Sequence, residues 1–363
     1  MAQQHLDPPT DSTVGPVSGD ALAGYLRAQA TEFLRSLRQH RETGADGGTP
    51  ARAKSRAESR PGENGSGENR SGESVDAARA LRRSARRISG TLHTFRPLLD
   101  ADWSEGMRPE LAWLSGTLAR EHAYAARLER LLGALNRLSG ASGFPTQAGG
   151  QGATPKAHLT VGAAKAGALL DRQLTLARTR AHSAALQALG SSRFHAVADS
   201  VAVLASEVPL TPAATTADLR PLAAAATDRL TDAVTALPLV TAGHPYNAEA
   251  LVHGLSADTA PHPQDAPWHQ VRLLLRLHRY ACEVLYGEDA PADVRLLAAG
   301  QALNRHRDAA EAASAAASAA RTPRIAPATA YALGVLHADQ RHEVEAARFA
   351  FQQSWRKEAV HTR

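Results

Sequence analysis

Residues 74–100 read SVDAARALRRSARRISGTLHTFRPLLD, and six of the residues between positions 79 and 96 are arginine. On a helix, which turns about 100° per residue, Arg79, Arg82 and Arg86 fall within one stripe roughly 60° wide. The large apolar residues of the stretch fall on a different face. The pattern predicts a helix with a basic stripe on one side and a core-facing side opposite.

A second stretch, PWHQVRLLLRLHRYACEVL at residues 267–285, repeats this spacing. At an offset of 190 residues, Arg82 aligns with Arg272, Arg86 aligns with Arg276, and Arg79 aligns with His269. The second stretch is apolar on both flanks of its basic strip, so we expect this helix to be mostly buried.

Several cations on a buried helix are unfavourable unless an anion meets them. Glu283 is the one acidic residue on the same strip, so a ligand is a candidate for the rest of the counter-charge. A solvated charged face is the alternative for the first helix. Arginine suits phosphate oxygens because its planar fork donates two parallel hydrogen bonds and keeps its charge. Three such groups on a helix suit an extended polyanion better than one small anion.

Composition places the 363-residue chain in the all-α class, because alanine and leucine are abundant and runs of valine and isoleucine are almost absent. The formal charge is +5. Cys282 is the single cysteine, which excludes disulfides within the chain and a cysteine-based metal cage. The N-terminus lacks the pattern of a leader peptide and no apolar run is long enough to span a membrane, so we expect a soluble, cytoplasmic protein.

The predicted organisation is a disordered tail over 1–17 and a helical domain over 18–363. The domain divides into a first lobe over about 18–189, with a disordered Gly/Ser/Glu/Arg-rich insert at 44–73, and a second lobe over about 190–363. Helices are expected at about 18–41, 76–96, 104–139, 156–189, 191–207, 215–237, 267–287, 291–320 and 326–359.

In the order and spacing of its motifs, the chain resembles the CHAD domains (conserved histidine α-helical domains), which bind inorganic polyphosphate. The resemblance lies in ALRRSARRISGTLHTFRPLL, ELAWLSGTL, GSSRFHAVADSVAVL, WHQVRLLLRLHRYACEVL, LNRHRDA and AYALGVLHA. It spans residues 20–358 apart from the insert. It implies two helical bundles related by pseudo-twofold symmetry, with long helices lining a basic central groove.

Carried over residue by residue, the resemblance implies polyphosphate contacts from Arg79, Arg82, Arg86, Arg87, His269, Arg272, Arg276 and Arg279. Arg193, His306 and His337 are weaker candidates. Arg79 stands where the family has its first histidine. Arg83 points away from the stripe and is expected to be solvated.

Catalytic motifs have little support. GAAKAGA lacks the second half of a P-loop, and HEVEA lacks the second histidine of a zinc-protease motif. We therefore expect no enzyme activity, no cofactor and no metal. The hypothesis is non-catalytic polyphosphate binding, with attachment to polyphosphate granules as an extension. The alternatives are a generic polyanion or nucleic-acid backbone binder without base-specific recognition, and a helical interaction scaffold that has lost its ligand.

Overall fold

A computed structural model describes residues 19–45, 65–140, 156–244, 263–287 and 293–356. The helices are α1 (Gly19–Ala45), α3 (Gly65–Thr94), α4 (Ala101–Leu138), α5 (Lys156–Leu189), α6 (Ser192–Ser206), α7 (Arg220–Thr235), α8 (Leu239–Ala242), α10 (Ala266–Tyr286), α11 (Val294–Ala320) and α12 (Pro327–Arg356). Three short 3-10 helices join them: η1 (Arg96–Leu98), η2 (Pro212–Thr215) and η3 (Pro263–Asp265). Within these ranges no strand forms, apart from one isolated bridge between Leu99 and Leu210. The prediction of an all-α fold is confirmed.

The helix containing the first arginine stretch begins at Gly65, earlier than expected, and α1 continues to Ala45. Residues 65–73, predicted to belong to the disordered insert, are therefore helical. Because the segment continues an existing helix, it needs no new nucleation step, which outweighs the low helix propensity of its three glycines. Residues 46–64 of the insert and the N-terminal tail lie outside the described residues.

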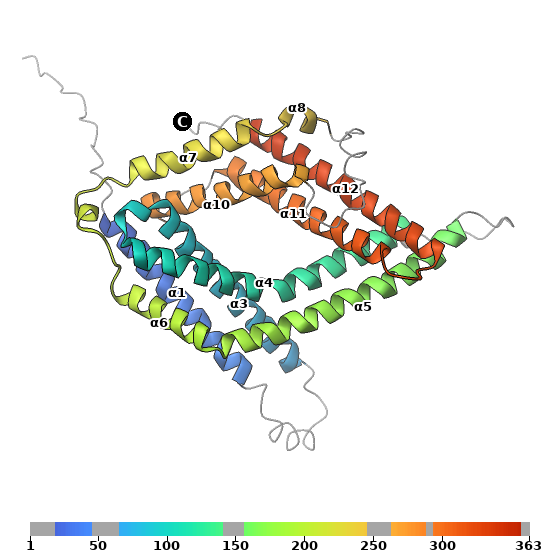
Figure 1. The fold of residues 1–363 in the computed structure, drawn as a ribbon, viewed down its shortest axis with the longest axis horizontal. Helices are drawn as coiled ribbons and strands as arrows, with labels where there is room; N and C mark the ends of the chain where they lie inside the picture. Colours follow the sequence, from blue (N-terminus) through green and yellow to red (C-terminus); the bar gives the residue numbers. More distant parts are fainter. Residues whose placement is uncertain (1–18, 46–64, 141–155, 245–262, 288–292, 357–363) are drawn as a thin grey trace, which may run out of the picture.

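The two arginine helices contact each other and lie between α1 and α7, in the left half of the view (Figure 1). The apolar face of α3 is buried against α1, as its periodicity predicts, through Leu81, Ala85, Ile88, Leu92 and Phe95. Helix α10 packs along α7 on one side and α11 on another. It is apolar on both flanks and mostly buried, as predicted.

Each arginine helix is followed by two long helices that pack on each other, α4 with α5 and α11 with α12 (Figure 1). Three apolar clusters form the core of the described residues. One of them joins α4 and α5 to α11 and α12, and another joins α1 and α3 to α6, so the core is continuous across residue 190. The twofold relation between the halves stays a prediction.

Helices α3 and α10 approach closely at Gly90. A Cβ added to Gly90 would lie 2.6 Å from Cδ2 of Tyr280 and 3.2 Å from Cδ2 of Leu277. Both of these side chains are buried and cannot swing away freely. The missing side chain at position 90 therefore sets how near the two arginine helices lie.

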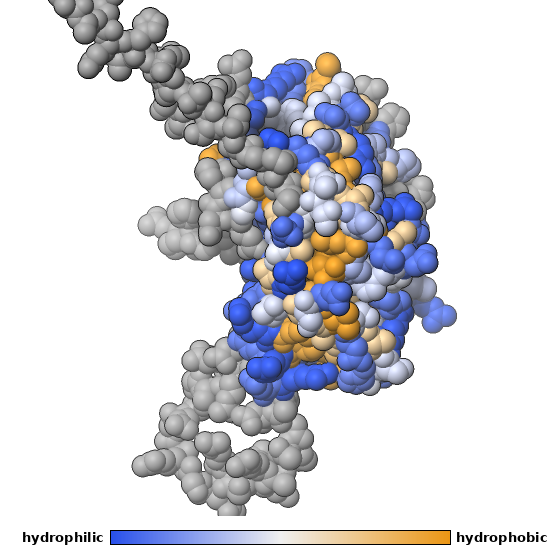
Figure 2. Space-filling model, turned by 90° about the vertical axis from the view of Figure 1, so that its left-hand side faces the viewer, coloured by the Kyte–Doolittle hydropathy of each residue, from blue (hydrophilic) through white to orange (hydrophobic). Residues whose placement is uncertain are grey.

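On the face at the left of Figure 1, apolar residues gather toward the middle and hydrophilic residues surround them (Figure 2). None of the described helices is long and apolar enough to cross a bilayer.

Gly90→Ala tests the close approach of α3 and α10. We expect it to lower the free energy of unfolding by about 1–2 kcal/mol, because overpacking against Tyr280 outweighs the gain in helix propensity. The matched control is Gly133→Ala in α4, where the added Cβ meets nothing within 4 Å among the described residues. The control should raise stability by up to about 1 kcal/mol. Denaturant unfolding of both variants measures the difference, and equal effects would contradict the close packing.

Candidate anion-binding site

Three helices bring guanidinium groups together where α3 meets α10 and α11. Helix α3 contributes Arg82 and Arg86, α10 contributes Arg272 and Arg276, and α11 contributes Arg307. These five residues are named the arginine cluster. The five guanidiniums are electrostatic neighbours, because a charge on one of these helices lowers the pKa of arginines on the others.

A cavity of about 450 Å³ opens beside the cluster, bounded by α3, α4, α10 and α11. Its cationic and titratable lining residues are Arg82, Arg86, His93, Arg108, Arg276 and Arg307. No carboxylate is among its lining residues in the described part of the chain. The cavity is therefore positively charged on several sides at once.

The cluster residues of α3 and α10 bond to neutral acceptors. Arg86 Nε donates to Ser115 Oγ at 3.0 Å, and Arg272 Nε donates to Asn304 Oδ1 at 2.7 Å. Arg276 Nε lies 3.4 Å from the carbonyl oxygen of Arg272. Arg82 Nε is buried, and no described residue supplies it with an acceptor. The four guanidiniums thus keep donors that no carboxylate of the described chain occupies.

Arg307 forms ion pairs with acidic neighbours, and the charge of one of them, Asp308, also raises the pKa of Arg272. It pairs with Asp308, the next residue, and lies 3.8 Å from Glu311 one helical turn away. Even so, its charge lowers the pKa of both arginines on α3. The cluster therefore retains a positive excess.

Burial and mutual repulsion disfavour the charged forms of these arginines. Burial, with the charges of Arg86 and Arg307, lowers the pKa of Arg82 to about 10. Burial, with the charge of Arg276, lowers the pKa of Arg272 to about 9. Both stay protonated at neutral pH, so a bound anion would relieve the strain.

His93 lines the cavity beside the cluster, whereas the predicted site residue His269 lines neither cavity and contacts His306. Burial lowers the pKa of His93, and nearby Arg108 adds to that effect. Burial also lowers the pKa of His269, against an opposing effect of Asp265 and with a further contribution from Arg272. Both imidazoles are therefore largely neutral at pH 7 in the free protein.

A second cavity of about 560 Å³ lies on the other side of α10, between it and α11. Arg272, Arg276 and Arg279 line it, and Arg276 lines both cavities. Glu283 and Asp293 also line this second cavity, so, unlike the first, it contains carboxylates. The basic strip of α10 lies between the two cavities.

Two of the predicted residues point to a carboxylate instead of the cavity beside the cluster. Arg87 Nε donates to Glu283 Oε2 at 2.8 Å, and Arg279 Nε lies 3.1 Å from Glu283 Oε1. Arg79 is largely exposed and pairs with Asp76 at 3.2 Å. Its charge still reaches Arg82, where it contributes to the lowered pKa.

The weaker candidates all have other contacts. Arg193 forms a two-pronged bond to Glu110 and stacks 4.1 Å from the ring centre of Trp113 on the surface. His337 is buried, with Nδ1 3.0 Å from the carbonyl oxygen of Ala313. Neither residue lies among those lining the two cavities beside α10.

His306 belongs to a buried network at the N-terminus of α10. Asp265, at the start of that helix, binds Arg341 at 2.8 Å and Arg348 at 2.6 Å, and both of these arginines come from α12. His306 Nε2 lies 3.5 Å from Asp265, and its ring contacts His269 edge-on. Burial alone would raise the pKa of Asp265, but hydrogen bonds from His306 and Arg341 lower it overall. The network anchors α10 and reaches the site through His269.

Several arginines that join helices elsewhere in the described fold have carboxylate partners. Along the second half of α4, Arg127 pairs with Glu311 at 2.5 Å, Arg130 with Glu343 at 3.5 Å, and Arg137 with Asp339 at 3.7 Å. These pairs join α4 to α11 and α12. Pairing with a carboxylate thus distinguishes these arginines, which join helices, from the cluster residues on α3 and α10.

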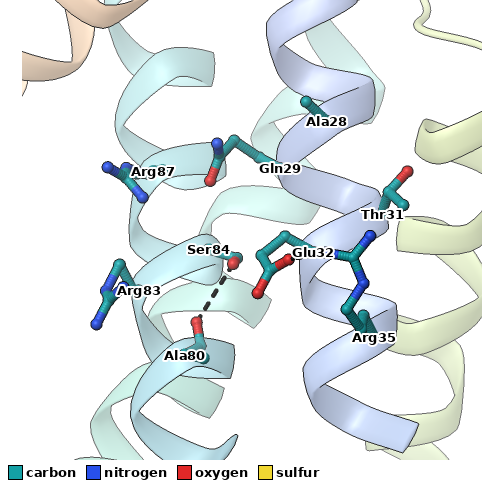
Figure 3. Close-up of a pocket in the computed structure, with 9 residues that line it drawn as sticks. All are labelled: Ala28, Gln29, Thr31, Glu32, Arg35, Ala80, Arg83, Ser84 and Arg87. Atoms are coloured by element: carbon teal, nitrogen blue, oxygen red, sulfur yellow. Dashed lines mark hydrogen bonds and ion pairs between the residues drawn. The ribbon is translucent and has the colours of Figure 1, made fainter. Parts of the chain in front are cut away.

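A further pocket lies between α1 and α3 (Figure 3). Figure 3 shows Arg83 and Arg87 on α3, and Glu32 and Arg35 on the facing part of α1. Glu32 and Arg35 pair at 2.7 Å, so this pocket already contains a carboxylate. Arg83 is exposed, as predicted, and it lines this pocket instead of the cavity beside the cluster.

The sequence patterns did not identify Arg307 and Arg108 as site residues. Arg307 directly follows the candidate His306 in the motif LNRHRDA, and this position was the one sequence feature that could have indicated it. Arg108 lies in no repeated pattern. Across the described ranges, no group of three or more His, Cys, Asp or Glu side chains is arranged to hold a metal ion.

The family model named CHAD domain matches residues 66–317, and the chain belongs to this family. The solved structure of PptA from Streptomyces chartreusis is similar at a TM-score of 0.74 and 70% sequence identity. The match covers 94% of this chain and 100% of that one. None of the curated proteins matches the chain.

The buried His306 predicts a loss of stability in mild acid. Burial and Arg348 lower its pKa from 6.5 to about 4, so between these values the unfolded chain binds the proton and the folded protein does not. The free energy of unfolding should therefore fall by about 3 kcal/mol as the pH drops from 6.5 to 4. Denaturant unfolding of wild type and His306→Gln measures this. An equally steep loss of unfolding free energy in both proteins would show that protonation of His306 is not its cause.

Proposed function

We propose that the protein binds linear inorganic polyphosphate, without catalysis, along the arginine cluster. The observation that carries the proposal is the cavity lined by five arginines from four helices and by no carboxylate of the described chain. Phosphate oxygens match guanidinium donors in geometry and charge, and partial burial strengthens such hydrogen bonds. Membership of the CHAD family, whose members bind polyphosphate, supports the same ligand class.

The layout of the cluster favours a chain over a single phosphate ion. Residues four apart on a helix rise by about 6 Å, so Arg82 and Arg86, like Arg272 and Arg276, present donors at successive positions. Arg276 lines both cavities, so its guanidinium borders the space on either side of α10. A linear polyanion can contact all of these groups at once, whereas one phosphate would reach only a few of them.

A nucleic-acid backbone is the alternative ligand, because it too is a chain of phosphates. Single-stranded nucleic acid is commonly held by aromatic side chains on which the bases stack. Tyr280 is the aromatic residue lining the cavity beside the cluster, and it is buried against Gly90. The site thus offers phosphate contacts without a stacking surface, which favours inorganic polyphosphate. Attachment to polyphosphate granules in the cytoplasm is the extension of this proposal.

Substitution within the cluster tests the proposal. Arg86→Gln combined with Arg276→Gln should weaken binding to polyphosphate roughly tenfold or more and make the salt dependence shallower by about two units of slope. Arg83→Gln combined with Arg193→Gln is the control, since it removes the same charge outside the cluster. Calorimetric titration at several salt concentrations measures both pairs. Equal losses would indicate attraction by net charge alone.

Competition distinguishes polyphosphate from other polyanions. Bound fluorescent polyphosphate should be displaced by unlabelled polyphosphate at much lower concentration than by single-stranded DNA of equal charge. Equal displacement would support a generic polyanion binder. No binding even at low salt would leave the scaffold interpretation.

Binding should tighten as the pH falls below 7. The pKa values of His93, which lines the cavity, and of His269, which feels the charge of Arg272, are lowered in the free protein, and an anion bound to the cluster favours their protonated forms. The complex therefore takes up protons, so affinity rises as the pH approaches 5.5. Titrations of wild type and of His93→Gln combined with His269→Gln measure this, and the variant should show a flatter profile. Identical pH profiles of wild type and variant would exclude these two histidines as the source of the pH dependence of binding.

A further inference from the structure

The cavity between α10 and α11 has two ends of different chemistry. Its volume of about 560 Å³ lies within the range of pockets that hold small molecules. The two helices run antiparallel along it. At one end Arg272 Nε donates to Asn304 Oδ1, and Tyr286 and Asp293 line the other end, where the chain passes from α10 to α11. Each end can therefore bind a different part of one ligand.

The first end of the cavity is cationic. Arg272 and Arg276 line it one helical turn apart, and both bond to neutral acceptors through Nε. Neither forms an ion pair with a carboxylate of the described chain. Burial is the main cause that lowers the pKa of both guanidiniums, so an anion beside them is favoured. This end suits phosphate oxygens.

The two carboxylates of the cavity have partners of their own. Glu283 accepts from Arg87 at 2.8 Å and lies 3.1 Å from Arg279 Nε. Asp293 pairs with Arg295 at 2.8 Å. Both acids therefore have their charge compensated by other guanidiniums than the two at the cationic end. They leave that end available to a ligand.

The opposite end of the cavity is largely apolar and carries an aromatic ring. Tyr286 is 67% exposed and Leu297 is 43% exposed, so a flat apolar group placed there would remove their surface from water. Gly300 leaves room between the two ends, because an added Cβ would meet only Leu275 Cδ2, at 3.5 Å, among the described residues. Gln301 adds an amide to the same lining. An aromatic ring with hydrogen-bonding edges fits this mixture better than an acyl chain.

We propose that this cavity binds a nucleoside triphosphate, with its phosphates on Arg272 and Arg276 and its base beside Tyr286. Arg276 and Tyr286 are separated by about 15 Å along α10, a span that an extended nucleoside triphosphate can bridge. The inference goes beyond the proposed function and does not depend on it, because Tyr286 and Leu297 line this cavity and not the one beside the cluster.

The test compares ATP with inorganic tripolyphosphate in calorimetric titrations of the whole chain in EDTA. Tripolyphosphate carries at least as much negative charge, so charge alone would favour it. We expect ATP to bind about fivefold or more tightly, because base stacking adds to the phosphate contacts. Tyr286→Ala should remove most of this preference and change the affinity for tripolyphosphate by less than about twofold. Tyr331→Ala on α12 is the matched control, since Tyr331 is also 67% exposed and lines neither cavity.

Two further variants test the position of the ligand. Gly300→Met places a side chain in the cavity and should weaken ATP binding roughly tenfold, while the gain in helix propensity preserves the fold. Arg272→Gln should weaken both ATP and tripolyphosphate about tenfold, because it removes a charged donor. Arg108→Gln changes a residue that lines only the cavity beside the cluster. A loss of ATP affinity as large as that of Arg272→Gln would place the triphosphate there and overturn the inference.

The outcomes separate this inference from the proposed function. Wild type that binds polyphosphate but holds ATP no more tightly than tripolyphosphate would overturn this inference alone. Wild type that prefers ATP, with the preference lost in Tyr286→Ala, but fails to bind polyphosphate at low salt would overturn the proposed function alone. If Gly300→Met loses its helical circular-dichroism signal, Tyr286→Ala decides: an unchanged preference for ATP would contradict a base seated at this end.

Discussion

The fold holds several like charges close together in partial burial, and this repulsion is the constraint that the site must satisfy. Arg82, Arg86, Arg272 and Arg276 keep their charges, although burial and their neighbours lower their pKa values. The arrangement is stable because apolar contacts on the opposite faces of α3 and α10 fix the helices independently of the charges. The free protein therefore carries an electrostatic strain that an anionic chain would relieve.

The same molecule contains arginines of a second kind, and their partners show how the fold distinguishes the two. Arg341 and Arg348 are buried, and both bind Asp265, which anchors α10 to α12. Arg127 and Glu311 join α4 to α11 across the fold. Where a structural role is required, the sequence supplies a carboxylate. In the cavity beside the cluster, the described chain supplies none, which is the physical basis for assigning that place to a ligand.

Much of this could be predicted from the sequence, because helical periodicity and the offset of 190 residues both depend on local spacing. They identified the fold class, nearly all helix positions, and the four cluster residues on α3 and α10. They could not identify Arg307, whose entry into the site depends on how α11 crosses α10. Nor could they show that Arg87 is bound by Glu283, a residue 196 positions away. Spacing along one helix indicates a face, whereas the partner of that face is set by packing between helices.

The central claim is that polyphosphate meets the unpartnered donors of the cluster, and Arg82 tests it most directly. Its Nε is buried, with no acceptor among the described residues. In an NMR titration with linear polyphosphate, the account predicts that the Arg82 Nε–Hε signal shifts strongly and becomes protected from exchange, while that of Arg127 on α4 stays in place. Saturating polyphosphate that leaves the Arg82 signal unchanged and shifts that of Arg127 would contradict the account.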